Sequence, residues 1–263
     1  MRIVEDTYMG YSPTSEVDAE DVNLSSFEVN ETLNPKIWVN EKINSDVRVA
    51  LLKIADDFVD TLSMDWIEPL DILFTGSLAN YNWSEYSDID LHILYDFKKI
   101  YDNTEFVEDY FKAKRNLWNE EHDDISIYGF PVEISVEDSN NPAKSSGVYS
   151  LENNEWVKLP KDLSDATLNK DYIKETAAEY MTKIDDIEDI LSELDDKRKL
   201  LKINKSAERM FDRLKDMRKK GLETEAGEMA SDNIVWKVLR REGYLDKLCD
   251  IMDVTYDKMM SLG

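Results

Sequence analysis

The sequence predicts an α+β protein, in which a small mixed β-sheet with flanking helices is followed by a C-terminal helical bundle. Up to residue 163, short apolar runs typical of strands alternate with helical stripes, whereas the pattern from Asp171 onward is helical throughout. The first 30 residues are rich in Asp, Glu, Ser and Asn and have no clear period. We therefore expect a flexible acidic arm over 1–30, a mixed domain over 31–163 and a helical bundle over 164–263.

Within the mixed domain, the segment Leu33–Trp38 is expected to be ordered and to lead into a helix whose apolar stripe runs from Val47 to Leu62. The next elements, in order, are a strand at 71–75, a short helix, a strand at 88–95, a helix at about 103–119 and a strand at 125–137. A hairpin over 147–157, turning at Asn153–Asn154, completes the domain.

The helical domain is expected to form a four-helix bundle. Its first helix carries apolar residues that step by four and three, as in a helix that packs on another helix: Ile173, Ala177, Tyr180, Ile184, Ile187, Leu191 and Leu194. A second helix should stop near Gly221, a third should be capped by Ser231 or Asp232 and end at Gly243, and a fourth should cover 244–262. The 173–194 seam could alternatively serve a dimer, so the oligomeric state is left open.

Composition narrows the classes of function. The 263 residues carry a formal net charge of -25, which argues against wide contact with nucleic acid because its phosphates would be repelled. One cysteine excludes a disulfide framework, and two histidines with that cysteine argue against a zinc site. No apolar run approaches membrane-spanning length. We expect a soluble protein of the cytoplasm.

The most informative segment runs from Thr75 to Leu94. Gly76-Ser77 ends one apolar run, and Asp88-Ile89-Asp90 opens the next after ten intervening residues. Carboxylates at i and i+2 of a strand share a face, and they repel each other unless a cation lies between them. Oxygen-only ligands favour magnesium over zinc. The strand therefore indicates half of a metal site.

We expect the Gly-Ser turn to face that site and to bind phosphate. A glycine lets the backbone approach a ligand closely, and a helix start just after it directs free N–H groups outward. Phosphate here and metal on the neighbouring strand would hold a nucleoside triphosphate for transfer of its nucleotidyl group. Gly76, Ser77, Asp88 and Asp90 resemble the Gly-Ser…Asp-x-Asp motif of the DNA-polymerase-beta-like nucleotidyltransferase superfamily. The resemblance implies Mg²⁺ or Mn²⁺ as cofactor and a nucleoside triphosphate such as ATP as donor.

The resemblance also implies a third acidic residue on a following strand. Glu133 is our choice, because it lies deepest in the apolar alternation of 125–137. Its implied role is to ligate the catalytic metal or to accept a proton from the attacking hydroxyl. Glu137 and Asp138 are the alternatives, nearer the strand end. Aspartate is the more usual residue at this place in the superfamily.

Two further segments, Leu33–Trp38 and the 147–157 hairpin, are similar to segments in uncharacterised nucleotidyltransferase-like proteins of tailed bacteriophages. This second resemblance spans most of the chain. For a phage-encoded protein it implies the host cytoplasm as location.

A basic segment stands out from the acidic remainder. Residues 197–220 contain eleven Lys and Arg against three Asp and Glu. Lys202, Lys205 and Arg209 are candidate nucleotide contacts, binding either the triphosphate or an anionic acceptor. The alternative is a solvated helix face that pairs with the acidic helix before it.

These observations predict a magnesium-dependent nucleotidyltransferase that moves a nucleotidyl group to an acceptor hydroxyl and releases pyrophosphate. Gly76 and Ser77 would hold the β- and γ-phosphates, Asp88 and Asp90 the metal, and Glu133 would activate the acceptor. The acidic surface favours a small molecule or a protein over long nucleic acid as acceptor. The alternative is a non-catalytic binding protein that keeps this fold and acts through protein–protein contacts.

Overall fold

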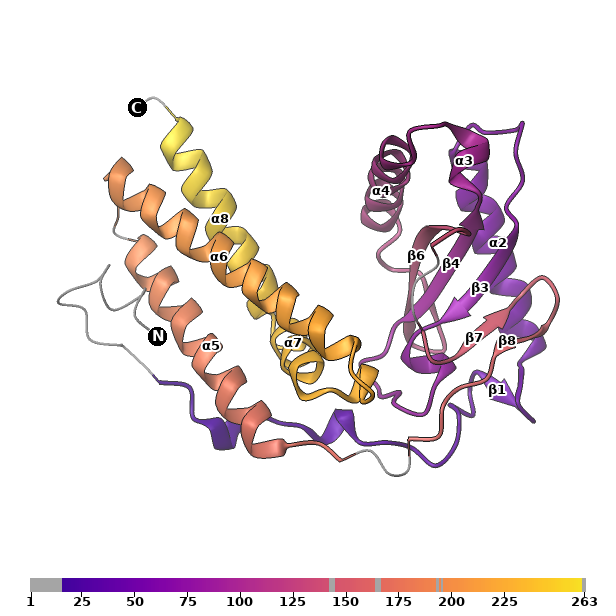
Figure 1. The fold of residues 1–263 in the computed structure, drawn as a ribbon, viewed down its shortest axis with the longest axis horizontal. Coiled ribbons are helices and arrows are strands. Elements are labelled where there is room, and N and C mark those ends of the chain that lie inside the picture. The colour runs from indigo at the N-terminus through magenta and orange to yellow at the C-terminus, as the bar shows by residue number, and fades with distance from the viewer. Residues whose placement is uncertain (1–15, 142–144, 164–166, 193, 195, 262–263) are drawn as a thin grey trace. The chain divides into compact units, whose positions relative to one another are not determined.

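The computed structural model describes residues 16–141, 145–163, 167–192, 194 and 196–261. The chain forms two compact units (Figure 1). The sheet unit is Ser26–Asp165, and the helical unit joins Met1–Ser25 to Ala166–Gly263. No helix in the described residues combines the length and apolar character needed to cross a bilayer.

The sheet unit is built on a six-stranded sheet in the order β5-β6-β4-β3-β7-β8. Its strands are β3 (Asp71–Thr75), β4 (Ile89–Tyr95), β5 (Ser126–Ile127), β6 (Phe130–Asp138), β7 (Val148–Ser150) and β8 (Glu155–Lys158). β4 is antiparallel to β3 and parallel to β6, so the sheet is mixed, as predicted. β7 and β8 pair as the predicted hairpin.

Helices α2 (Ser45–Thr61) and α4 (Thr104–Glu121) pack on one face of this sheet. Alternate residues of β4 are fully buried in the shared core, with Ile89, Leu91 and Ile93 each 0% exposed. The intervening residues of β4 therefore point to the other face. A short helix, α3 (Phe97–Ile100), follows β4. The burial pattern of β4 thus separates a core face from a polar face.

The segment Leu33–Trp38 is ordered, as expected, but a small hairpin precedes α2. Strands β1 (Trp38–Val39) and β2 (Lys42–Ile43) are joined through Asn40 and Glu41, which have φ of 51° and 62°. The Trp38 ring stacks on Trp156 with ring centroids 4.6 Å apart. Its indole N–H donates to the Leu78 carbonyl at 2.7 Å. The hairpin has no Asn-Gly or Asp-Gly signal, which explains why the sequence did not predict it.

The expected single strand at 125–137 is instead two strands. β5 and β6 pair across a tight turn at Tyr128 and Gly129, whose φ values are 53° and 89°. The apolar alternation in the sequence continues through this turn, so the pattern predicted one uninterrupted strand. Gly129 was the available signal, because a left-handed backbone favours glycine.

The helical unit contains α5 (Lys170–Ser192), α6 (Lys197–Leu222), α7 (Ser231–Arg241) and α8 (Tyr244–Met260) among its described residues. This arrangement confirms the predicted C-terminal helical bundle. Except for the half-buried Leu194, the residues of the 173–194 seam are buried by packing within the chain, where α5 meets α7 and α8. The seam therefore does not offer the alternative dimer surface. The N-cap of α7 is Ala230, with no side-chain cap, in place of the predicted Ser231 or Asp232.

Residues 16–25 differ from the expected flexible arm. They include a 3₁₀ turn, η1 (Ala19–Asp21), capped by Asp18. Val22 and Leu24 are buried, and the Val17 N–H donates to Thr182 Oγ1 at 3.0 Å. A few apolar residues in an acidic segment are enough for packing, although the average composition conceals them. A second turn, η2 (Ser25–Phe27), leads into the sheet unit, and the first 15 residues lie outside the described part.

Candidate active site

The three predicted carboxylates meet on the polar face of the sheet. Asp90 of β4 lies opposite Thr75 of β3 and opposite Glu133 of β6, so these residues form one row across three strands. Asp88 lies just before β4. Asp88, Asp90 and Glu133 each offer a carboxylate oxygen within 4.8 Å of the others. Their role as metal ligands stays a prediction, but the strand register is what brings them together.

The donor set suits a hard divalent cation. Two carboxylates about 5 Å apart repel by a few kcal/mol before solvent screening, at an effective dielectric constant of about 20. A bound cation relieves this repulsion for all three pairs of carboxylates. Only oxygen atoms are offered, which favours Mg²⁺ or Mn²⁺ and disfavours zinc.

Gly76 brings the backbone of the Gly-Ser turn against this cluster. Its φ of 76° and ψ of -165° are open to glycine and strained for other residues. A Cβ atom placed on Gly76 would lie 1.6 Å from Asp90 Oδ2. The turn and the carboxylates are therefore in direct contact, and a side chain at Gly76 is excluded.

A serine outside the predicted set closes the loop between the two halves of the motif. Ser77 Oγ donates to Ser87 Oγ at 2.7 Å, and the Ser84 N–H donates to Ser87 Oγ at 2.9 Å. Ser87 is buried. The ten residues between Ser77 and Asp88 are thus folded back so that both ends meet. The available signal was the small hydroxyl residue directly before Asp88.

The alternative third carboxylates have other partners. Glu137 Oε1 lies 2.6 Å from His92 Nδ1. Burial lowers the pKa of His92, whereas the contact with Glu137 and the negative charges of Asp90 and Glu133 raise it. The raising effects outweigh the burial, so the pKa of His92 lies above its ordinary value. Asp138 accepts hydrogen bonds from the Phe97 and Asn140 N–H groups at 3.3 and 3.1 Å. Of the three candidates, Glu133 is the one beside Asp88 and Asp90.

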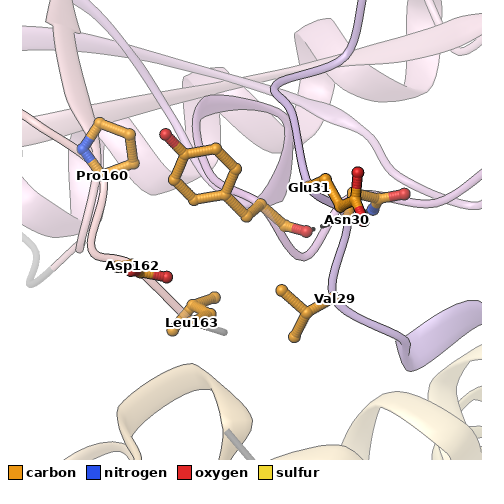
Figure 2. Close-up of a pocket in the computed structure, with 7 residues that line it drawn as sticks. Val29, Asn30, Glu31, Pro160, Asp162 and Leu163 are labelled. Carbon is orange, nitrogen blue, oxygen red and sulfur yellow. Dashed lines mark hydrogen bonds between the residues drawn. The ribbon is translucent and has the colours of Figure 1, made fainter. Parts of the chain in front are cut away.

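A pocket of about 630 Å³ lies beside the loop that carries the motif (Figure 2). It is lined by Val29, Asn30, Glu31, Tyr81, Pro160, Asp162 and Leu163. The Asn30 N–H and side-chain amide both donate to the Tyr81 carbonyl, at 2.7 and 3.2 Å. None of the predicted site residues lines this pocket.

The predicted basic contacts lie on α6 of the helical unit. Lys202, Lys205 and Arg209 are exposed. Within the described residues, no carboxylate forms an ion pair with any of the three. Among the described residues, the ion pairs of α5 involve other groups. Lys247 Nζ of α8 lies 2.7 Å from Asp185, Lys174 pairs with Glu20 of η1, and Lys183 pairs with Glu179 within α5 itself. Pairing with the preceding acidic helix therefore does not account for these three side chains, and their contact with a nucleotide stays a prediction.

Comparison with known proteins identifies the family. The family model described as "Nucleotidyltransferase domain" matches residues 53–220, more than half of the chain. The chain belongs to this family. This nucleotidyltransferase matches no curated protein. One solved structure, titled "Structure of STING-associated CdnE c-di-GMP synthase from Capnocytophaga granulosa", is 12% identical, with 85% of this chain and 90% of that chain covered and a TM-score of 0.21. A TM-score this low establishes neither a common substrate nor a common acceptor.

Proposed function

We propose that this nucleotidyltransferase is magnesium-dependent and transfers a nucleotidyl group from a nucleoside triphosphate to an acceptor hydroxyl, with release of pyrophosphate. The observation that carries the proposal is the meeting of Asp88, Asp90 and Glu133 within 4.8 Å, directly against the Gly76 backbone. A phosphate held by the turn would thereby lie next to three oxygen ligands.

Each residue has a defined role in the proposal. Gly76 and Ser77 bind the β- and γ-phosphates through backbone N–H groups and the serine hydroxyl. Asp88, Asp90 and Glu133 hold Mg²⁺ or Mn²⁺, which neutralises the charge that develops on the phosphate oxygens. Glu133 also accepts the proton of the attacking hydroxyl. Attack on the α-phosphorus forms the new P–O bond, and the bond to the β-phosphate oxygen breaks as pyrophosphate leaves.

Lys202, Lys205 and Arg209 are proposed to contact the nucleotide or an anionic acceptor from α6. The formal net charge of -25 favours a small molecule or a protein as acceptor over a long nucleic acid. We also propose the host cytoplasm as its location, which rests on the resemblance of Leu33–Trp38 and the 147–157 hairpin to segments of phage proteins.

The test is a thermal-shift titration with ATP, GTP, CTP and UTP, each with and without Mg²⁺. A ligand that binds only the native state stabilises it by mass action, by about 2.7 kcal/mol when the ligand concentration is 100 times its dissociation constant. This stabilisation raises the unfolding temperature. We expect a magnesium-dependent shift with at least one nucleotide.

The double variant Asp88→Ala, Asp90→Ala should fold and lose that shift. The matched control is Asp56→Ala with Asp57→Ala, which removes two exposed carboxylates from α2 in the same unit. A retained shift in the Asp88, Asp90 variant would refute the assignment. No shift with any nucleotide in the folded wild type would favour the non-catalytic binding protein.

A further inference from the structure

Asn80 is a fully buried polar residue that the function described so far does not use. It follows the short turn η3 (Ser77–Ala79) and is 0% exposed. Its side-chain amide donates to the Gly76 carbonyl at 2.6 Å, and its Oδ1 accepts from Ser146 Oγ at 2.5 Å. Both ends of a buried amide are therefore occupied by specific partners.

The hydrogen bond from Asn80 to the Gly76 carbonyl restricts the direction of the Ser77 N–H. A trans peptide is planar, so the Gly76 carbonyl and the Ser77 N–H point in opposite directions. The Gly76 carbonyl also accepts from the Ala79 N–H at 3.2 Å, which closes η3. With its carbonyl held by Asn80 and Ala79, the Gly76–Ser77 peptide plane cannot rotate freely, and the Ser77 N–H keeps one orientation.

The segment leading into β7 holds Asn80 from the other side. A Cβ atom on Gly147 would lie 2.1 Å from the Ala79 carbonyl oxygen and 2.9 Å from Asn80 Oδ1. Gly147 therefore lets the chain pass close enough for Ser146 to reach Asn80. Ser146 and Asn80 are 66 residues apart in sequence, so this contact ties the loop after β6 to the turn after β3.

We propose that Asn80 is a positioning residue for the triphosphate. Held by Ser146 and Gly147, it fixes the Gly76 carbonyl and so directs the Ser77 N–H toward the phosphates. This inference rests on the proposed function, in which Gly76 and Ser77 bind the β- and γ-phosphates. Neither Asn80 nor Ser146 is required to touch the nucleotide.

The experiment compares binding of a nucleoside triphosphate with binding of the corresponding monophosphate, with Mg²⁺ in both cases. The ratio of the two dissociation constants isolates the contribution of the β- and γ-phosphates. One charge-assisted hydrogen bond corresponds to about a tenfold change or more in affinity. We expect Asn80→Ala to reduce the triphosphate preference about tenfold and Ser146→Ala to reduce it by a smaller factor. Asn141→Ala, an exposed asparagine in the same unit, should leave the preference unchanged.

A purely structural role would lower the unfolding temperature and leave the triphosphate-to-monophosphate ratio unchanged, and that result would overturn the proposal. If Asn80→Ala does not fold, Ser146→Ala decides, because Ser146 is only partly buried. An unchanged ratio in that variant would overturn the proposal as well.

A second measurement separates this inference from the proposed function. The Asn80 side chain and the Ala79 N–H both donate to the Gly76 carbonyl. Hydrogen exchange of the Ala79 amide, followed by NMR without nucleotide, therefore reports on how firmly that carbonyl is held. We expect at least about tenfold faster exchange in Asn80→Ala than in Asn141→Ala. Unchanged exchange would reject the role of Asn80 and leave the proposed function intact. A wild-type protein with no triphosphate preference would reject both.

Discussion

Replacement of Gly76 by alanine should separate the geometry of the site from the stability of the fold. The new Cβ would lie 1.6 Å from Asp90 Oδ2 and 2.6 Å from Asp90 Cγ, where contacts below 3.0 Å do not persist. The Asp90 carboxylate must therefore move by more than about 1 Å. A displacement of about 1 Å at a catalytic group can cost about 100-fold in rate.

The same substitution strains the backbone. A non-glycine residue at φ of 76° and ψ of -165° costs about 1–3 kcal/mol. For a unit of this size, each kcal/mol lowers the unfolding temperature by about 4 °C, so we expect a decrease of about 4–12 °C.

Gly129→Ala is the matched control. Gly129 also has a positive φ, 89°, but a Cβ there meets nothing within 4 Å. Thermal unfolding should show a loss of stability in both variants, whereas metal-dependent nucleotide binding and turnover should fall about 100-fold in Gly76→Ala alone. If Gly76→Ala binds and turns over nucleotide as Gly129→Ala does, the contact between the turn and Asp90 has no role in the site.

Other substitutions test the charges and the core. Asp88→Asn with Asp90→Asn should raise the free energy of unfolding by about 1 kcal/mol in metal-free buffer, measured by urea denaturation, because like charges are removed; a decrease would show that the cluster is not repulsive. For Asp138, partial burial raises the pKa, but hydrogen bonds from the Asn140 backbone and side chain and from the Phe97 backbone lower it overall. Its contribution is therefore present above the unfolded-state pKa and is lost as the pH falls through the lower folded-state pKa. Asp138→Asn should destabilise by about 1 kcal/mol at pH 7, with the difference vanishing at acid pH; a difference that persists in acid would contradict this. Leu91→Ala, at a position 0% exposed, should cost about 2–5 kcal/mol in urea denaturation, and a cost below 1 kcal/mol would show that β4 is not a core strand.

The polar face of β4 was predictable because strand side chains alternate. Because Ile89, Leu91 and Ile93 are apolar, Asp90 was expected on the opposite, polar face of β4. The same alternation predicted that Glu133 lies on the polar face of the strand that carries it. Sequence alone did not show that β4 and β6 are parallel neighbours in the register that puts Asp90 opposite Glu133. That register depends on contacts between residues far apart in the chain.

The hydrogen bond between Asn80 and Ser146 could not be predicted from the sequence, because it too joins residues far apart in the chain. Asn80 and Ser146 carry ordinary polar side chains, and only the folded chain shows that they meet. The turn at Gly129 and the packing of Val22 and Leu24 were missed because local averages of hydropathy and charge conceal single residues. Long helical stripes were easier to predict, since the period of α5 repeats over 23 residues.

The most direct test is a crystal structure with Mn²⁺ and a non-hydrolysable nucleoside triphosphate, with manganese located by its anomalous scattering. We predict an anomalous peak bound by oxygens of Asp88, Asp90 and Glu133, with the β- and γ-phosphates at Gly76 and Ser77. Nucleotide bound elsewhere, or manganese bound away from these three carboxylates, would contradict the proposed active site.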